Sequence, residues 1–199
     1  MLSSTVRTRS VNAPAAGTVS RYSVSTRVLH WLAAVLVFTT LLVGFVLANS
    51  LGSYTVLLGL HMALGALVFV VFAVRVANRL THRAPTLPGT VGRAERLVVV
   101  GSELALYVLL LAQPLVGWAM LSASGVPVVL FGAFRLPPIA PVDAGLYGVL
   151  RNGHSVLAYT LVVLIAAHVS AVLLHTLTLR DGMMRRMTFG GGEKSRAAR

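Results

Sequence analysis

The sequence contains no cysteine and very few acidic residues, and both absences narrow what the protein can do. Without cysteine there is neither a disulfide framework nor a thiolate metal site, so any metal must be bound by histidine, methionine or a carboxylate. Asp and Glu number only 5 against 17 Lys and Arg, and charged residues of both signs make up 11% of the chain. So low a content of charge is untypical of a soluble domain.

The sequence is instead rich in long apolar runs, and 56% of its residues are hydrophobic. Four segments reach the roughly 20 apolar residues that are needed to cross the hydrocarbon core of a bilayer. They lie at about 28–48, 54–76, 97–121 and 153–177. The expected fold is therefore an all-α integral membrane protein, with an antiparallel four-helix transmembrane bundle over residues 21–187.

The two ends of the sequence differ in composition from this middle part. Residues 1–20 are rich in serine, arginine and small residues and contain no acid, which is typical of a disordered basic tail and loosely resembles an organelle transit peptide. Residues 188–199 combine glycine with charged residues, and we expect a flexible tail there as well.

The basic residues predict the orientation in the membrane. Fifteen of the 17 precede the first span, flank the second connection or follow the last span, and the third connection holds only Arg135 and Arg151. Because cytoplasmic connections carry the excess of Lys and Arg, both termini are expected to be cytoplasmic. Anionic lipid headgroups are the nearest partner for this basicity, and we expect no nucleic-acid partner.

Four histidines lie inside the apolar segments and fall at two depths. His154 and His168 are 14 residues apart, which in a helix corresponds to about 21 Å along the axis and about 40° of rotation, so both face the same way. Because successive spans run in opposite directions, His61 comes to the level of His154 and His30 to the level of His168. The sequence predicts an outer pair, His61 with His154, and an inner pair, His30 with His168.

Paired histidines at two depths favour two haems, one near each leaflet. Neutral imidazole is a standard axial ligand of haem iron, and helix bundles build haem sites from inward-facing side chains. Intramembrane histidines also serve in hydrogen bonds between helices, in proton relays and in cation transport. A haem-free ion or proton transporter is therefore the alternative that the histidines alone leave open.

Arginines stand at both predicted levels. Arg75 follows His61 by 14 residues and so falls at the inner level, with Arg79 one turn further along. Arg151 lies three residues before His154, near the outer level. Haem propionates are anionic and need cationic partners, so the three arginines are candidate cofactor-binding residues.

Four other residues are candidates on weaker grounds. Gly44 lies 14 residues after the first-span histidine and faces the outer level, where its missing side chain leaves room for a porphyrin, although glycine also serves plain helix packing. His175, near the cytoplasmic boundary, would bond a propionate or a quinone, or be solvated there. Glu103 is the one acid inside a span, and it would carry protons to a quinone or pair with an arginine. Tyr22 would contact a cofactor or anchor the inner interface.

Motifs along the chain together resemble those of the bacterial cytochrome b561 family, a group of four-helix dihaem membrane proteins. The resemblance covers about residues 21–187. It rests on the order of the motifs rather than on any one of them. They are Arg21-Tyr22-Ser23, Leu29-His30-Trp31, Leu60-His61-Met62 with Arg75 and Arg79, Leu106-Tyr107, Pro114-Leu115-Val116-Gly117-Trp118, Phe131-Gly132, Leu136-Pro137, Gly153-His154 through His168 to His175, and Arg180-Asp181-Gly182-Met183.

The resemblance implies two b haems, ligated by the four intramembrane histidines. Members include a superoxide oxidase that passes electrons from superoxide at the outer face to ubiquinone, and cytochrome subunits of hydrogenases and other dehydrogenases. It thus implies a membrane oxidoreductase of the bacterial inner membrane. If superoxide is the donor, Arg135 and Arg151 are the basic side chains at the outer face that would attract it. The alternative is a cytochrome b subunit that serves a partner dehydrogenase or hydrogenase. The chain departs from the family at Glu103, where many members carry histidine.

Overall fold

Four long helices make up most of the protein. The computed structural model describes residues 22–49, 52–81, 92–179, 184 and 187–188. The expected N-terminal tail and all but the first residue of the expected C-terminal tail lie outside these ranges. The elements are α1 (Val24–Asn49), α2 (Tyr54–Thr81), α3 (Arg93–Ala123), β1 (Val129–Leu130), β2 (Phe134–Arg135), α4 (Ala144–Leu173) and the π-helical segment η1 (Leu174–Leu179).

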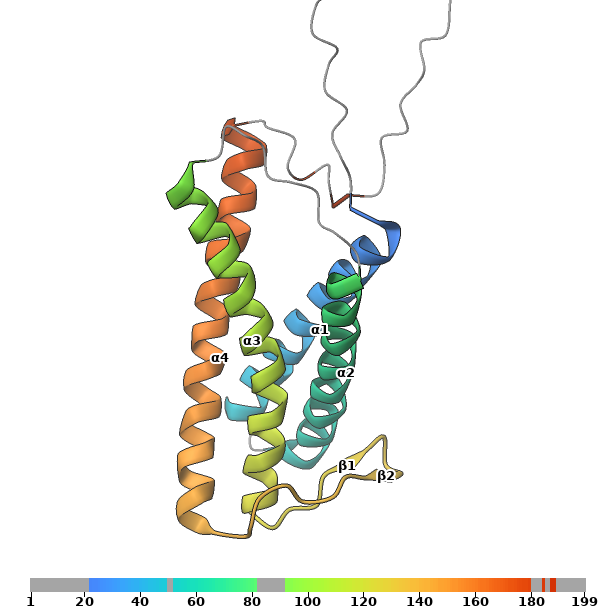
Figure 1. The fold of residues 1–199 in the computed structure, drawn as a ribbon. Coiled ribbons are helices and arrows are strands. Elements are labelled where there is room, and N and C mark those ends of the chain that lie inside the picture. Colours follow the sequence, from blue (N-terminus) through green and yellow to red (C-terminus); the bar gives the residue numbers. More distant parts are fainter. Residues whose placement is uncertain (1–21, 50–51, 82–91, 180–183, 185–186, 189–199) are drawn as a thin grey trace, which may run out of the picture.

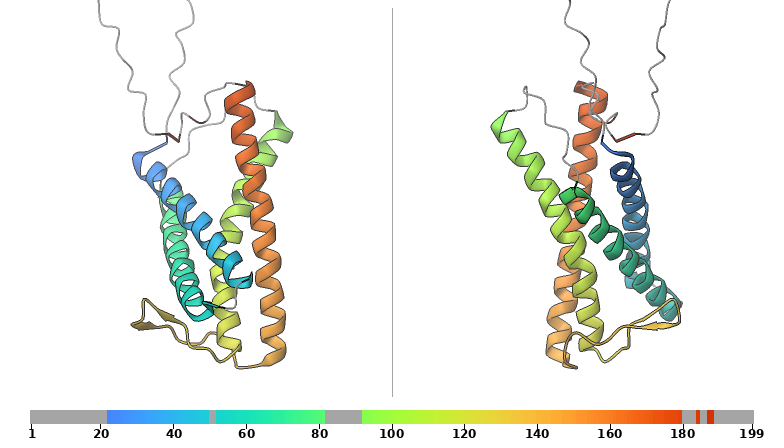
Figure 2. Two further views of the ribbon diagram at one scale, coloured as in Figure 1. Left: turned by 180° about the vertical axis from the view of Figure 1, so that it is seen from behind. Right: turned by 45° about the vertical axis from the view of Figure 1, so that its right-hand side comes forward.

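The helices run up and down as two antiparallel pairs. α1 packs along α2 and α3 along α4, and the two pairs meet mainly through α2 and α3 (Figures 1 and 2). The start of α1 and the end of η1 lie at one end of the bundle, which we call the inner end. The β1–β2 hairpin lies at the opposite, outer end (Figure 1). All four helices are long and apolar enough to cross a membrane, which confirms the predicted all-α transmembrane bundle.

Helix α4 begins nine residues before the apolar run that predicted it. Asp143 caps its N-terminus, where the carboxylate accepts a hydrogen bond of 2.6 Å from the amide of Leu146. The first turns of α4 are mostly apolar and end at the polar pair Arg151 and Asn152, so Arg151 lies on the helix itself rather than in a loop. This polar pair interrupts the apolar run, which is why the sequence placed the start of the span at residue 153.

Most large apolar side chains point outward, as they do in a protein that is surrounded by lipid. Phe45 on α1 and Val56 on α2 are 68% and 74% exposed. The buried core is correspondingly small and lies halfway along the bundle. It consists of Ala33, Val37, Val68, Phe72, Leu110 and Leu161.

The outer connection between α3 and α4 contains a short antiparallel hairpin. Val129 pairs with Arg135 and Leu130 with Phe134. At the tip, Phe131 (φ 52°) and Gly132 (φ 71°) both adopt left-handed backbone conformations. They are the first two residues of a three-residue loop, and the amide of Ala133 closes the turn by donating a hydrogen bond of 3.1 Å to the carbonyl of Leu130.

Candidate functional site

A seven-residue spacing places three layers of side chains on the inward faces of the helices. Seven residues are nearly two helical turns, so positions spaced by seven stay on one face. The middle layer is apolar and buried, with no member more than 6% exposed: Val37, Val68, Leu110 and Leu161. Seven residues away on one side lies the inner layer, His30, Arg75, Glu103 and His168, and seven away on the other side lies the outer layer, Gly44, His61, Gly117 and His154.

The outer layer brings together the two histidines that the sequence paired. The ring centroids of His61 and His154 lie 6.2 Å apart, with an angle of 82° between the ring planes. One histidine comes from α2 and the other from α4, so each helix pair contributes one ring. Both residues are partly buried.

The inner layer brings together the second predicted pair. The ring centroids of His30, on α1, and His168, on α4, lie 6.5 Å apart, with an angle of 61° between the planes. Trp31 packs edge-on against the His30 ring at 5.6 Å. His30 is partly buried and His168 is exposed.

The spacing of both pairs suits two imidazoles that share one metal ion. An imidazole nitrogen binds a transition metal at about 2.0–2.1 Å, so two rings on opposite sides of one metal have centroids about 6.4 Å apart. The observed 6.2 Å and 6.5 Å agree with this separation. Within the described residues no group of three or more His, Asp or Glu side chains gathers around a metal position. Haem iron needs only two protein ligands, because the porphyrin supplies the others.

Gly44 stands at the outer level, as predicted, but the space beside it is filled by protein. A side chain added at Gly44 would place its Cβ 2.8 Å from Cε1 of His61. The missing side chain therefore makes room for the histidine ring, where the sequence analysis expected it to make room for a porphyrin. Gly117 has the same relation to His154, with a Cβ-to-Cε1 distance of 3.1 Å.

Sequence reasoning missed Gly117, although a signal was present. Gly117 lies 14 residues after Glu103, the same offset that separates Gly44 from His30. The structure places Gly117 in the outer layer beside a candidate metal ligand, and the offset from Glu103 would have predicted that position.

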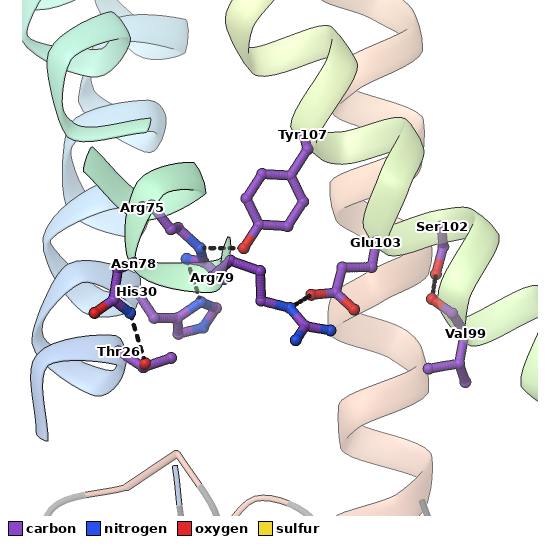
Figure 3. Close-up of polar contacts among 9 residues, drawn as sticks. All are labelled: Thr26, His30, Arg75, Asn78, Arg79, Val99, Ser102, Glu103 and Tyr107. Carbon is purple, nitrogen blue, oxygen red and sulfur yellow. Dashed lines mark hydrogen bonds and ion pairs between the residues drawn. The ribbon is translucent and has the colours of Figure 1, made fainter. Parts of the chain in front are cut away.

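Arg75 reaches the inner level, as predicted, and contacts the histidine there directly (Figure 3). Its Nη1 lies 2.9 Å from Nδ1 of His30, and its Nε donates a hydrogen bond of 3.1 Å to the hydroxyl of Tyr107. The guanidinium also lies over the rings of Phe72 and Tyr107, at 5.7 Å and 5.5 Å. A guanidinium only donates, so Nδ1 of His30 accepts and Nε2 carries the proton in this arrangement.

Arg79 pairs with Glu103, one helical turn from the contact between Arg75 and Tyr107. Nε of Arg79 lies 3.4 Å from Oε1 of Glu103, and the side chains are 41% and 43% exposed (Figure 3). This is the arginine pairing that was one of the two expectations for Glu103. Arg79 is therefore paired with a carboxylate of the protein. Arg75, also at the inner level, has no carboxylate partner among the described residues.

The remaining candidates lie on elements at the two ends of the bundle. Arg135 is exposed on β2, and Arg151 is exposed on α4, where its Nη1 donates a hydrogen bond of 3.2 Å to the hydroxyl of Tyr147. Tyr22 is partly buried just before α1, and His175 is partly buried within η1. Their proposed roles toward a cofactor or a substrate stay predictions.

Four membrane-crossing helices with histidine pairs at two depths define a class, the membrane proteins that are built to hold metal cofactors inside a helical bundle. Comparison with known proteins identifies the family. A sequence profile of the family described as prokaryotic cytochrome b561 matches residues 21–190. The chain belongs to this family, whose general function is transmembrane electron transfer through b haems.

Two relatives from Escherichia coli (strain K12) agree with this assignment. Cytochrome b561 homolog 2 is 31% identical over 174 residues, which cover 85% of this chain and 92% of the relative. Cytochrome b561 homolog 1 is 27% identical over 177 residues, which cover 85% of this chain and 97% of the relative. Both alignments extend over nearly the whole of each relative.

Proposed function

We propose that the protein transfers electrons across the bacterial inner membrane through two b haems, each held by one of the two histidine pairs. His61 and His154 would hold the outer haem, and His30 and His168 the inner one. The observation that supports this assignment is the matched spacing of the two pairs, 6.2 Å and 6.5 Å between ring centroids, at two levels of one bundle. Bound haem supplies an iron that gains and loses one electron.

Arg75 has to change partner for His30 to bind a metal through Nε2. In the present contact Nδ1 of His30 accepts from the guanidinium, which places the proton on Nε2 and blocks that nitrogen. When Arg75 releases Nδ1, the proton moves there and Nε2 becomes free. The released guanidinium would then bind a carboxylate such as a haem propionate, while Tyr107 still accepts the hydrogen bond from its Nε.

The apolar middle layer separates the two histidine levels and excludes water from the space between them. Its buried aliphatic side chains offer no polar group to water between the levels. His154 and His168 are separated by 14 residues of continuous helix, about 21 Å along the axis. This arrangement suits two separate redox sites, one near each side of the membrane.

Haem content tests the assignment directly. A reduced-minus-oxidised spectrum of the purified protein, with haem quantified per polypeptide, should give two b haems. His61→Ala and His30→Ala should each keep one. Ser155→Ala should keep both, because among the described residues the Ser155 hydroxyl bonds only the carbonyl of Arg151 on its own helix. Absence of haem from the wild-type protein, or two haems in His61→Ala, would overturn the assignment.

For the substrates, we propose superoxide as the outer electron donor and ubiquinone as the acceptor. Two superoxide ions would lose one electron each and leave as dioxygen, and the two electrons with two protons would convert ubiquinone to ubiquinol. Arg135 and Arg151 are exposed at the outer end and would attract the anion. The pairing of Glu103 with Arg79 supports a structural role for this acid, and its transfer of protons to a quinone stays a prediction.

Stopped-flow mixing with superoxide tests the donor. Haem reduction should exceed the uncatalysed background, and it should slow in the double variant Arg135→Gln/Arg151→Gln and at high ionic strength, because two positive charges steer the anion. If a protein that holds two haems shows no reduction above background, superoxide is excluded as the electron donor. That result would favour the alternative, a cytochrome subunit that receives electrons from a partner dehydrogenase or hydrogenase.

A further inference from the structure

We propose that Gly44 and Gly117 are positioning residues that set the orientation of the two outer histidines. The inference rests on the proposed function, because it concerns how His61 and His154 present their nitrogens to a metal. It follows from the way in which each imidazole lies against a glycine of the neighbouring helix.

Each glycine lies beside the same edge of its histidine ring. From a Cβ built on Gly44, the distances to Cε1, Nδ1 and Nε2 of His61 are 2.8, 3.2 and 3.8 Å. From a Cβ built on Gly117, the corresponding distances to His154 are 3.1, 3.4 and 4.0 Å. In both cases Nε2 is the ring nitrogen farther from the glycine. The contact therefore leaves Nε2 as the less crowded of the two nitrogens.

The two helix pairs repeat this arrangement. In each pair the first helix provides the glycine and the second provides the histidine: Gly44 on α1 faces His61 on α2, and Gly117 on α3 faces His154 on α4. The same geometry thus occurs twice, in unrelated local sequences. A glycine that served only close helix packing would have no reason to lie against a histidine ring both times.

The glycines also leave the main chain of their own helix accessible to Nδ1 of each histidine. Nδ1 of His61 and of His154 is buried and has no hydrogen-bond partner among the described residues. The main chain of Thr40 approaches His61 and that of Gln113 approaches His154, in both cases without the geometry of a full hydrogen bond. Each of these residues lies four positions before its glycine.

This offset has a structural reason. A helical side chain leans toward the N-terminus and covers the turn before it, so a Cβ at either glycine would cover the main chain four residues earlier. Metal-ligating histidines commonly donate their other ring N–H to a backbone carbonyl, which fixes the ring and its tautomer. We infer that the absent side chains give the two Nδ1 atoms access to such carbonyls.

The inner pair is positioned by other means, which makes a selective test possible. His30 is contacted by Arg75 and Trp31, and no described glycine meets its ring. Glycines elsewhere in the bundle also lack this contact. A Cβ added at Gly59 on α2 or at Gly101 on α3 meets nothing within 4 Å.

The two substitutions should differ in severity. Carbon atoms attract best at about 3.5–4.0 Å, so an alanine Cβ at 2.8 Å from His61 forces the ring to move, and one at 3.1 Å from His154 forces a smaller shift. Alanine favours the helix more than glycine does, so neither change weakens the helix itself. Any loss therefore reflects the displaced ring.

The experiment compares Gly44→Ala and Gly117→Ala with Gly59→Ala and Gly101→Ala. Each protein is purified with its haems, and haem content, low-spin ferric EPR spectra and midpoint potentials are recorded, with His61→Ala used to assign the outer haem. We expect Gly44→Ala to shift the outer haem's EPR signal and potential or to lower haem content from two toward one. Gly117→Ala should do the same more weakly, and the inner haem and both controls should be unchanged.

Two results would overturn the inference. One is a Gly44→Ala protein with the same outer-haem signals as the wild type. The other is an equal change at both haems, because that would indicate a general packing defect. If the wild-type protein holds no haem, the proposed function fails first and separately. A wild-type protein with two haems and an unaltered Gly44→Ala variant would refute the positioning role alone.

Discussion

At the scale of single residues, the two arginines of the inner level have different partners. Arg75 contacts His30 and Tyr107, whereas Arg79 forms an ion pair with Glu103. Charge inside a membrane segment is costly unless it is paired, so Glu103 balances one of the two cations. The other cation keeps an excess positive charge beside the inner histidine pair, where the proposed function needs it.

This charge balance predicts a compensating double mutant. Arg79→Gln and Glu103→Gln should each destabilise the protein by about 1 kcal/mol, because each leaves one charge unpaired in a site that is more than a third exposed. Arg79→Gln/Glu103→Gln should be more stable than either single variant, since no charge remains unpaired. Thermal unfolding of detergent-solubilised protein, followed by circular dichroism, measures the effect.

Ser102→Ala is the matched control, because within the described part of the chain the Ser102 hydroxyl bonds only the carbonyl of Val99 on its own helix. It should leave the unfolding temperature almost unchanged. A double variant that loses as much stability as the two single variants combined would show that the two side chains do not act as a pair.

The histidine pairs could be predicted from the sequence because their spacing is a property of helices. Fourteen residues keep two side chains on one face whatever surrounds the helix, so the partners of His154 and His168 followed from depth alone. The contact between Arg75 and Nδ1 of His30 could not be predicted. It depends on how α1 and α2 are rotated about their axes, which hydropathy does not determine.

At the scale of elements, two tryptophans fasten the segments that follow α3 and α4. Nε1 of Trp118, near the end of α3, donates a hydrogen bond of 3.0 Å to the carbonyl of Pro137 in the outer connection. Nε1 of Trp31, on α1, donates one of 3.1 Å to the carbonyl of Met187, beyond the last helix. Nη1 of Arg27 donates to the neighbouring carbonyl of Thr188 at 3.1 Å.

These contacts predict local effects at opposite ends of the bundle. Trp31→Phe keeps an aromatic ring but removes the indole donor, so the segment around Met187 should detach more readily, by about 0.5–1.5 kcal/mol. Limited proteolysis should then cut this segment faster than in the wild type. Trp118→Phe is the matched variant, and it should expose the outer connection instead.

The two variants control for each other. Each should accelerate cleavage at its own end and leave the other end as resistant as in the wild type. Equal acceleration at both ends by either variant would indicate global destabilisation, and it would contradict the view that each tryptophan holds one segment.

Element boundaries were the part of the fold that the sequence predicted least well. The apolar run gave the fourth span from residue 153, while Asp143 starts the helix ten residues earlier through its cap. At the other end, η1 continues the chain past the α-helix with wider π-helical turns that include His175. Capping and π-helical winding are local backbone choices, and periodicity and hydropathy do not report them.

At the scale of the whole molecule, the bundle was predictable because lipid leaves few alternatives. Backbone groups in the hydrocarbon core must be satisfied within the segment, so apolar runs of this length become helices. The division into two helix pairs was not predictable from hydropathy. Because of this division, each histidine pair joins the two halves of the bundle. The inner pair joins α1 to α4, and the outer pair joins α2 to α4.

The orientation in the membrane gives a last prediction, which the absence of cysteine makes easy to test. The excess of basic residues near the start of α1, around the connection from α2 to α3 and after α4 predicts that both termini lie in the cytoplasm. Ala133→Cys, at the exposed turn of the outer hairpin, should react with a membrane-impermeant maleimide in intact spheroplasts. Ser4→Cys, before the first helix, should react only after permeabilisation, and the wild-type chain should stay unlabelled. The reverse pattern would place the hairpin in the cytoplasm, and Arg135 and Arg151 could not then meet superoxide from outside the cell.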